Sequence, residues 1–208
     1  MADNPELLQN TKLHLVNSID EAAEFKRWMS NKTRIAFDTE STGLDKMRDK
    51  VRLAQFGNTQ EGWAIPWDRW GGVVEEICRR YDGEYVMHNM IHDWLQVEQS
   101  CGIVLPRHKC HDTRVAAHVL HPMRSTALKS LASYYVDARA ASLSHSLDDV
   151  FKESGWTWAT VPIDFEPYWA YGALDTVLTA HLDEILMPRV MAEAPKPYDL
   201  ECAVISVP

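Results

Sequence analysis

The stretch Arg34-Ile-Ala-Phe-Asp-Thr-Glu-Ser-Thr-Gly-Leu-Asp45 is the part of the sequence on which the fold prediction depends. Its first residues are largely apolar and predict a buried strand that ends in two acids, Asp38 and Glu40. Because successive side chains of a strand point to opposite faces, these two acids project from the same face. Two neighbouring carboxylates repel each other, so a cation between them, or a proton on one of them, is expected. Taken alone, the pair could also be a polar turn that ends a strand.

The segments around this stretch alternate between strand and helix patterns. A short strand is expected at 13–16, and Ser18 with Glu21 forms a capping box that begins a helix ending near Met29. Further strands are expected at 51–57, 62–65 and 84–87, and helices at 71–80, 90–100, 112–120, 127–135, 145–153 and 166–186. We therefore expect an α/β fold with a mixed sheet that starts as an antiparallel hairpin, is flanked by helices, and is followed by a helical C-terminal half.

A second polar pair, Asn89 and Asp93, directly follows the strand expected at 84–87. Residues four apart at a helix start share one face of the helix. This face lies at the carboxyl end of a strand, where the sites of open α/β sheets gather. The alternative is helix capping, because Asn is a good N-cap and an acid in the first turn favours the helix dipole.

A third pair, Tyr171 and Asp175, lies inside the long apolar helix expected at 166–186. The two residues are four apart and so lie on one face, while neighbouring alanines and leucines supply the packing face. The presence of an acid in the middle of an apolar helix requires an explanation. Exposure to solvent is the alternative to a functional role for Asp175.

In this order, the three motifs resemble those of the DEDD exonuclease superfamily, in its tyrosine subgroup, whose fold is ribonuclease H-like (DnaQ-like). The resemblance spans about residues 12–187 and is closest to the 3′→5′ proofreading domain of family A DNA polymerases. Residues 37–45 match its first motif, and His111-Asp-Thr113 matches an intervening helix start. The histidine subgroup has its general base five residues before the last Asp, where this chain has Ala170. The tyrosine subgroup therefore fits.

The resemblance implies a metal-dependent exonuclease that removes nucleoside 5′-monophosphates from DNA 3′ ends and proofreads for a DNA polymerase. Its two Mg²⁺ or Mn²⁺ ions generate the nucleophile and stabilise the leaving oxygen, and hard oxygen ligands suit both ions. The resemblance also implies that Tyr171 orients the attacking water. The implied catalytic residues are Asp38, Glu40, Asp93, Tyr171 and Asp175, and the four acids among them are the implied metal ligands.

The resemblance further implies that Leu44, Asn89 and His92 bind the substrate. Leu44 would wedge between the last two bases, and core packing is the alternative for this leucine. The family often has Tyr where His92 stands, which favours stacking over a phenol hydrogen bond, and a surface histidine is the alternative. A phosphate track or a solvated loop is expected from the basic residues that follow, Lys46, Arg48, Lys50 and Arg52.

The composition limits how this chain can meet a nucleic acid. With 21 basic and 30 acidic residues among 208, the net charge of −9 has the wrong sign for binding DNA by surface charge alone. A basic patch, or a carboxylate cluster that recruits divalent cations, must act locally instead. No apolar run is long enough for a membrane span, the first ten residues lack a secretory signal, and the four cysteines are too sparse for a disulfide scaffold. We expect a cytoplasmic protein without a membrane partner.

The expected domain organisation is an exonuclease domain at 1–187, followed at 188–208 by a linker and the start of a truncated polymerase domain. Prolines 188, 195 and 197 are expected to end the last helix. The expected partners are the 3′ end of single-stranded DNA and a polymerase domain of the same chain that is absent from this sequence. Two alternatives are an RNA-trimming exonuclease similar to ribonuclease D and a non-catalytic DNA-binding spacer domain. The presence of all four acids and the tyrosine argues against the spacer.

Overall fold

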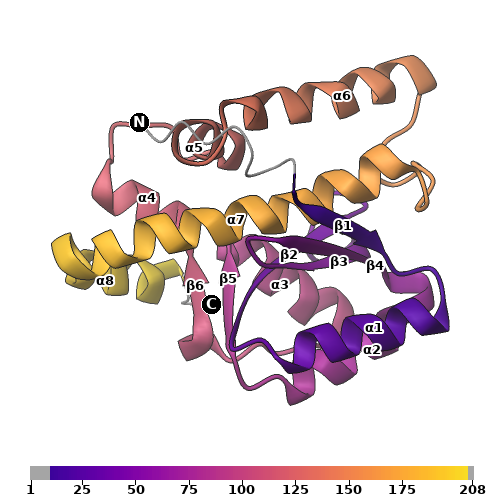
Figure 1. Ribbon diagram of the computed structural model, residues 1–208, viewed down its shortest axis with the longest axis horizontal. Coiled ribbons are helices and arrows are strands. Elements are labelled where there is room, and N and C mark those ends of the chain that lie inside the picture. The colour runs from indigo at the N-terminus through magenta and orange to yellow at the C-terminus, as the bar shows by residue number, and fades with distance from the viewer. Residues whose placement is uncertain (1–9, 206–208) are drawn as a thin grey trace.

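The computed structural model describes residues 10–205, apart from the side chains of 141–146 and 148, and contains a mixed six-stranded sheet between helical layers (Figure 1). The order of the strands is β1-β4-β3-β2-β5-β6. Strands β2, β3 and β4 pair antiparallel, whereas β1, β5 and β6 run parallel to their neighbours. The predicted α/β class, with its hairpin start, is confirmed. The strands are β1 (Lys12–Leu15), β2 (Arg34–Ser41), β3 (Val51–Gly57), β4 (Glu61–Pro66), β5 (Glu84–Met87) and β6 (Cys110–Asp112).

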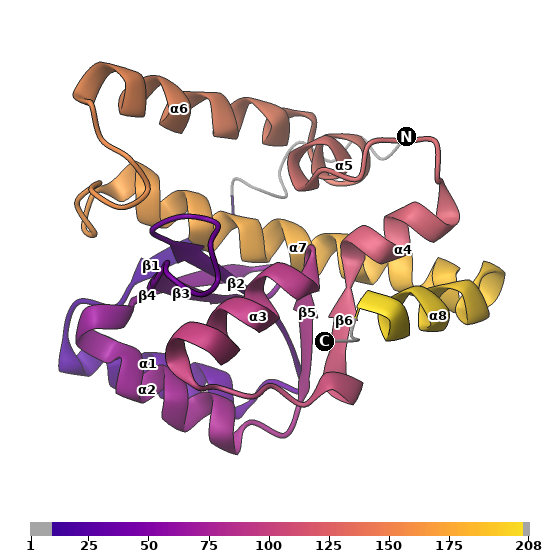
Figure 2. The ribbon, with the colours of Figure 1, turned by 180° about the vertical axis from the view of Figure 1, so that it is seen from behind.

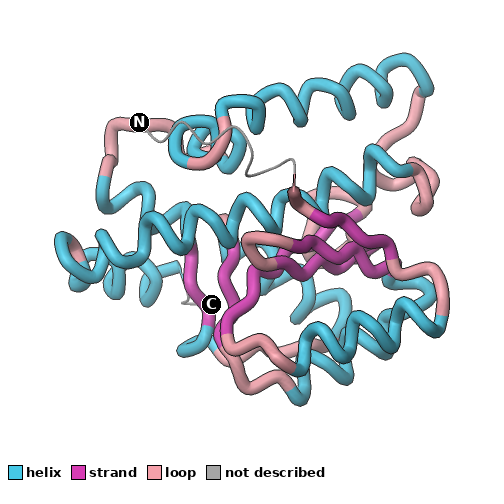
Figure 3. The backbone as a smooth tube through the Cα atoms, in the orientation of Figure 1, coloured by secondary structure: helices cyan, strands magenta, loops and turns pink. Residues whose placement is uncertain are grey.

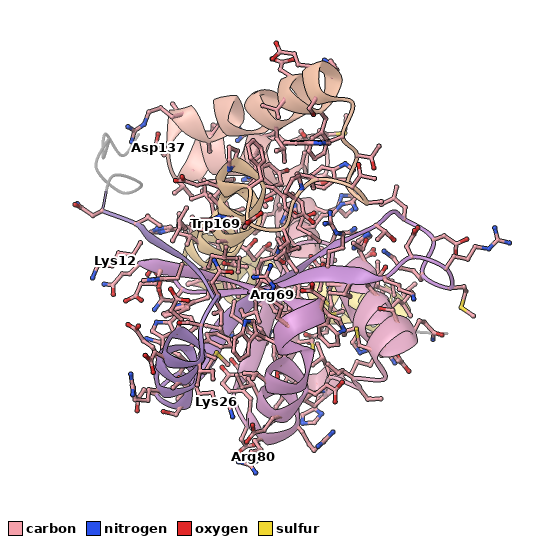
Figure 4. The ribbon with its side chains drawn as sticks, turned by 90° about the vertical axis from the view of Figure 1, so that its right-hand side faces the viewer. Lys12, Lys26, Arg69, Arg80, Asp137 and Trp169 are labelled. Atoms are coloured by element: carbon pink, nitrogen blue, oxygen red, sulfur yellow. The ribbon has the colours of Figure 1, made fainter. Side chains whose placement is uncertain are left out.

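The helices cover both faces of this sheet, and Figure 3 shows them surrounding the strands. Helix α7 crosses one face over β1 to β5, and α1, α2 and α3 lie on the other face (Figures 1 and 2). Figure 4 shows Trp169 of α7 above the sheet, and Lys26 of α1 and Arg80 of α2 below it. The helices are α1 (Ile19–Ser30), α2 (Trp67–Arg80), α3 (Met90–Cys101), α4 (Thr113–Leu120), α5 (Leu128–Tyr135), α6 (Ser142–Ser154), α7 (Glu166–Glu193) and α8 (Pro195–Ile205).

Glycines allow α7 to lie directly on the sheet. A Cβ atom at Gly62 of β4 would lie 2.2 Å from the carbonyl oxygen of Ala173, and one at Gly172 of α7 would lie 2.3 Å from Nε2 of Gln55. Neither distance is possible for a real carbon, so both positions need glycine for close approach. At Gly62 the contact that sets the height of α7 is with backbone, and at Gly172 it is with the Gln55 side chain.

The apolar and the acidic side chains of strand β2 point to opposite helical layers. Ile35 and Phe37 join the apolar cluster formed with α1, α2 and α3. Asp38 stands opposite Gln55 in the antiparallel pair, and the Gln55 side chain lies against Gly172 of α7. Directly opposed residues of an antiparallel pair share a face, so Asp38 and Glu40 point towards α7.

The structure differs from the local predictions at three points. Helix α2 begins at Trp67, four residues earlier than expected, and β6 was not predicted because three residues are too few to show a period. Pro188 does not end α7, which continues to Glu193. Leu186, Met187 and Val190 are buried in one apolar cluster with α4 and α5, and this packing offsets the ~3 kcal/mol that an interior proline costs. Among residues 10–205, no helix is long and apolar enough to cross a membrane.

Candidate active site

All eight residues singled out from the sequence line one cavity of about 420 Å³. Strand β2 and the loop after it contribute three of them, the start of α3 three, and α7 two. Strands β2 and β5 are parallel, so the end of β2 and the start of α3 lie at the same edge of the sheet. Helix α7 brings its residues to this edge from a distant part of the chain. The eight residues are Asp38, Glu40, Leu44, Asn89, His92, Asp93, Tyr171 and Asp175.

The two acids of β2 carry strongly perturbed carboxyl groups. Burial raises the pKa of Asp38 well above its ordinary value, and the charges of Asp93 and Glu40 raise it further. Burial and the charge of Asp93 raise the pKa of Glu40 to about 8. Both shifts have the same causes, because each carboxylate loses solvation here and lies close to other negative charges.

Asn89 does not cap α3 with its side chain. Its backbone is in the left-handed region, at φ 73°, and its Oδ1 accepts a hydrogen bond from Nη1 of Arg114 at 2.8 Å. The Asp112 carboxylate accepts hydrogen bonds from the backbone N–H groups of Asn89 (3.1 Å) and Met90 (2.8 Å) instead. The capping alternative is thus wrong for the Asn89 side chain, which lines the cavity.

Asp93 is 2% exposed and is held by strand β2. Its Oδ1 accepts hydrogen bonds from the backbone N–H of Thr39 at 3.0 Å and from the Thr39 hydroxyl at 2.6 Å. Nδ1 of His92 lies 3.6 Å from the same oxygen. These contacts fix the side of α3 that faces β2, and they explain why Asp93 and the acids of β2 are neighbours.

Asp175 is buried, at 7% exposed, so the alternative of solvent exposure is wrong. The Lys129 ammonium of α5 donates to its Oδ1 and lies 4.2 Å from the centroid of the Tyr171 ring. Burial lowers the pKa of Lys129 to about 8, and the charges of Asp38 and Glu40 oppose that shift. A positive side chain therefore lies among the acids.

The rim of the cavity is formed by the loop between β2 and β3 and by the segment before α7. Leu44 is 82% exposed, so the alternative of core packing is wrong. Arg52 is not part of a phosphate track, because its guanidinium donates to the carbonyls of Trp158 and Val161, both at 2.6 Å. This anchor holds the Trp158 ring at the cavity, where it lies 6.1 Å from the Tyr171 ring.

Several residues around the cavity were not foreseen from the sequence. Thr39 lies between the two predicted acids, and its side chain points to the opposite face, which alternation alone would have indicated. His88 lines the cavity, and its Nε2 donates to the carbonyl of Thr126 at 2.9 Å, which holds the chain just before α5. Lys129 and Trp158 reach the site from segments whose sequence gives no local signal of it.

The donor set fits divalent cations, although no cage is preformed. Within residues 10–205, apart from the side chains that are not described, no group of three or more His, Cys, Asp or Glu is arranged to hold a metal ion. Asp93 is engaged by Thr39, and Asp175 by Lys129. The four carboxylates nevertheless supply hard oxygen donors around one cavity, and a cation would relieve the repulsion that raises the pKa of Asp38. Cation binding would require these side chains to adjust.

A family model described as a 3′-5′ exonuclease matches residues 13–191. The DNA polymerase of Mycobacterium phage L5 is 27% identical over 175 residues, which are 75% of this chain and 29% of that polymerase. The chain thus spans less than a third of the length of this curated relative.

Two solved structures share the fold. Escherichia coli RNase D, an exoribonuclease involved in structured RNA processing, matches with a TM-score of 0.65 at 19% identity, covering 92% of this chain and 48% of that one. Brucella melitensis NrnC with bound Mg²⁺ matches with a TM-score of 0.64 at 16% identity, covering 94% of this chain and 88% of that one. Identities this low establish the fold and no more.

Proposed function

The chain belongs to the family of 3′-5′ exonuclease domains, as its motifs predicted, and we propose that it removes nucleoside 5′-monophosphates from the 3′ end of DNA. The observation that supports this most is the meeting of three separate motifs, from β2, α3 and α7, around one cavity. Asp38, Glu40, Asp93 and Asp175 are the proposed ligands of two Mg²⁺ or Mn²⁺ ions. When bound, these ions would activate the attacking water and neutralise charge on the leaving oxygen.

The other residues of the site position the substrate and the water. The Tyr171 phenol, one helical turn from Asp175, orients the water for attack in line with the terminal phosphodiester. Arg114 fixes the Asn89 side chain towards the terminal nucleotide, where the His92 ring stacks on a base. The exposed Leu44 side chain, on the rim, separates the last two bases.

The proposed setting is proofreading at the primer end of a DNA polymerase. The relatives of this chain are DNA polymerases, and the partner we propose is a polymerase domain that follows the exonuclease domain at 1–187. Trimming of RNA is the nearest rival, since RNase D has the same fold. A non-catalytic spacer is less well supported, because all five proposed catalytic residues are present.

The decisive test is the variant Asp38→Asn, assayed on single-stranded DNA labelled at its 5′ end, with Mn²⁺ or with EDTA. Removal of a proposed metal ligand should lower the rate at least about a hundredfold. The melting temperature (Tm) should stay the same or rise, because a neutral amide relieves the repulsion at Glu40. The exposed Asp199 of α8 gives the matched control, Asp199→Asn, which should keep the wild-type rate.

Three results would count against the proposal. If wild type and Asp38→Asn degrade DNA equally in a pure preparation, the acids are not catalytic. If matched strands of RNA are degraded faster than DNA, the substrate is RNA and the proofreading role is wrong. Release of oligonucleotides instead of mononucleotides would contradict an exonuclease.

A further inference from the structure

Lys129 occupies the place among the acids where a cation is expected. Its ammonium donates to Oδ1 of Asp175, and its side chain is only 13% exposed. Asp38 and Glu40 stabilise the ammonium as well when they are ionised. A buried carboxylate is strongly destabilising when unpaired, so a positive group at this point keeps the acids close together.

The surrounding structure fixes the direction from which Lys129 enters. His88 holds the carbonyl of Thr126 at 2.9 Å, three residues before the lysine. The apolar side chains of Leu131 and Ala132, on the same short helix, are buried against α7. The ammonium also lies 4.2 Å from the centroid of the Tyr171 ring, a favourable cation–π distance. The contact with Asp175 is thus supported from several sides.

We propose that Lys129 is the resident counter-ion of the acid cluster and that a divalent cation must displace its ammonium from Asp175 in order to bind. Lys129 is then a positioning residue, which keeps the site assembled before metal arrives and weakens metal affinity in return. The inference rests on the proposed metal-dependent function. It goes beyond that function by assigning the Lys129 ammonium as the cation of the metal-free state.

The test uses Lys129→Met, which keeps an unbranched side chain, one atom shorter, and removes the charge. In EDTA the variant should melt roughly 5–10 °C below wild type, because a buried pair has lost one partner. Mn²⁺ should bind it about tenfold more tightly by calorimetry, if the ammonium blocks Asp175 for nine-tenths of the time in the wild type. Mn²⁺ should also raise the Tm of the variant more than that of the wild type.

Two controls separate this inference from a general effect of removing a lysine. Lys152→Met removes an exposed lysine of α6, 76% exposed, and should change neither the Tm nor the Mn²⁺ affinity. Lys129→Arg keeps the charge and should keep both values near those of the wild type. A purely structural lysine would lower the Tm of Lys129→Met but would not tighten the binding of Mn²⁺.

The outcomes distinguish the two proposals. If wild type binds Mn²⁺ and Lys129→Met binds it equally or more weakly, the counter-ion role is overturned while the exonuclease proposal stands. If no variant binds Mn²⁺ while the wild type degrades DNA in EDTA, the proposed metal dependence fails and the counter-ion role fails with it. If Lys129→Met is unfolded in EDTA, recovery of the fold on adding Mn²⁺ supports the inference, and failure to recover overturns it.

Discussion

The acids of β2 are the residues where folding and function oppose each other. Asp38 and Glu40 are forced onto one face by strand alternation, next to Asp93 and on the lining of one cavity. A protein selected for stability alone would not keep this group, since removing a charge relieves repulsion. The raised pKa values of the two β2 acids result from that conflict, and such shifts are typical of functional sites.

This conflict predicts that the stability of the metal-free protein depends on pH, and that Glu40→Gln reduces this dependence. The folded, metal-free protein holds a proton at Glu40 up to about pH 8, whereas the unfolded chain loses it near the ordinary pKa of 4.5. The stability contributed by that proton is complete below the unfolded pKa and is lost as the pH rises through the folded pKa. In EDTA, the Tm of Glu40→Gln minus that of wild type should therefore increase from about pH 5 to about pH 8.

Thermal melting at several pH values checks this difference, which cancels titrations that the two proteins share. A Tm difference that stays constant, or that shrinks as the pH rises, would mean that Glu40 is ionised across this range. With saturating Mn²⁺, the wild type should gain most at the higher pH, because the cation binds the deprotonated carboxylates.

Among single residues, the sequence predicted those members of the cavity lining that lie close together along the chain. Pairs two apart on a strand or four apart on a helix are placed by geometry alone, and this holds for Asp38 with Glu40 and for Tyr171 with Asp175. The place of Lys129 at the site could not be predicted, because the sequence of its own helix carries no information about acids that are distant along the chain. Its role depends on how α5 docks on α7.

Among the elements, α7 links the sheet to the site. The helix contributes Tyr171 and Asp175, and its height above the strands depends on glycines at the points of closest approach. The strands other than β6, and most helices, were predicted from their periods. The continuation of α7 beyond Pro188 was not, because tertiary burial of Val190 outweighs the local cost of proline.

Two glycine-to-alanine variants in helices test the importance of this approach. Alanine in an open helix position stabilises by about 0.5–1 kcal/mol, and a Cβ atom at Gly72 of α2 would meet nothing within 4 Å, so Gly72→Ala should raise the Tm. Gly172→Ala should lower it, because the new carbon meets the fully buried Gln55 side chain. The nuclease rate should fall with Gly172→Ala only, since the neighbouring Tyr171 is displaced.

Differential scanning calorimetry and the DNA assay together check this pair. Equal gains in Tm from both variants would show that α7 can move away from the sheet without cost. An unchanged nuclease rate in Gly172→Ala would show that the position of α7 tolerates such movement.

For the molecule as a whole, the position of the domain boundary depends on whether α8 belongs to the folded unit. The sequence predicts a domain boundary after residue 187, yet α8 lies beyond it and contacts α4. The Tyr198 side chain is 4% exposed, and its hydroxyl accepts a hydrogen bond from the backbone N–H of Asp112 at 2.9 Å. Asp112 in turn holds the start of α3. Helix α8 is thus tied to the element that carries Asp93.

Two substitutions on α8 decide whether this helix belongs to the folded unit or to a linker. Tyr198→Ala removes a buried aromatic ring and should cost about 3–5 kcal/mol, whereas Leu200→Ala, on a side chain that is 65% exposed, should stay within about 0.5 kcal/mol of wild type. Urea unfolding of both variants measures these values. If both are neutral, α8 is not part of the stable unit and the boundary after 187 holds. If only Tyr198→Ala unfolds early, the exonuclease domain extends through α8, because a linker would not lose stability on losing one ring.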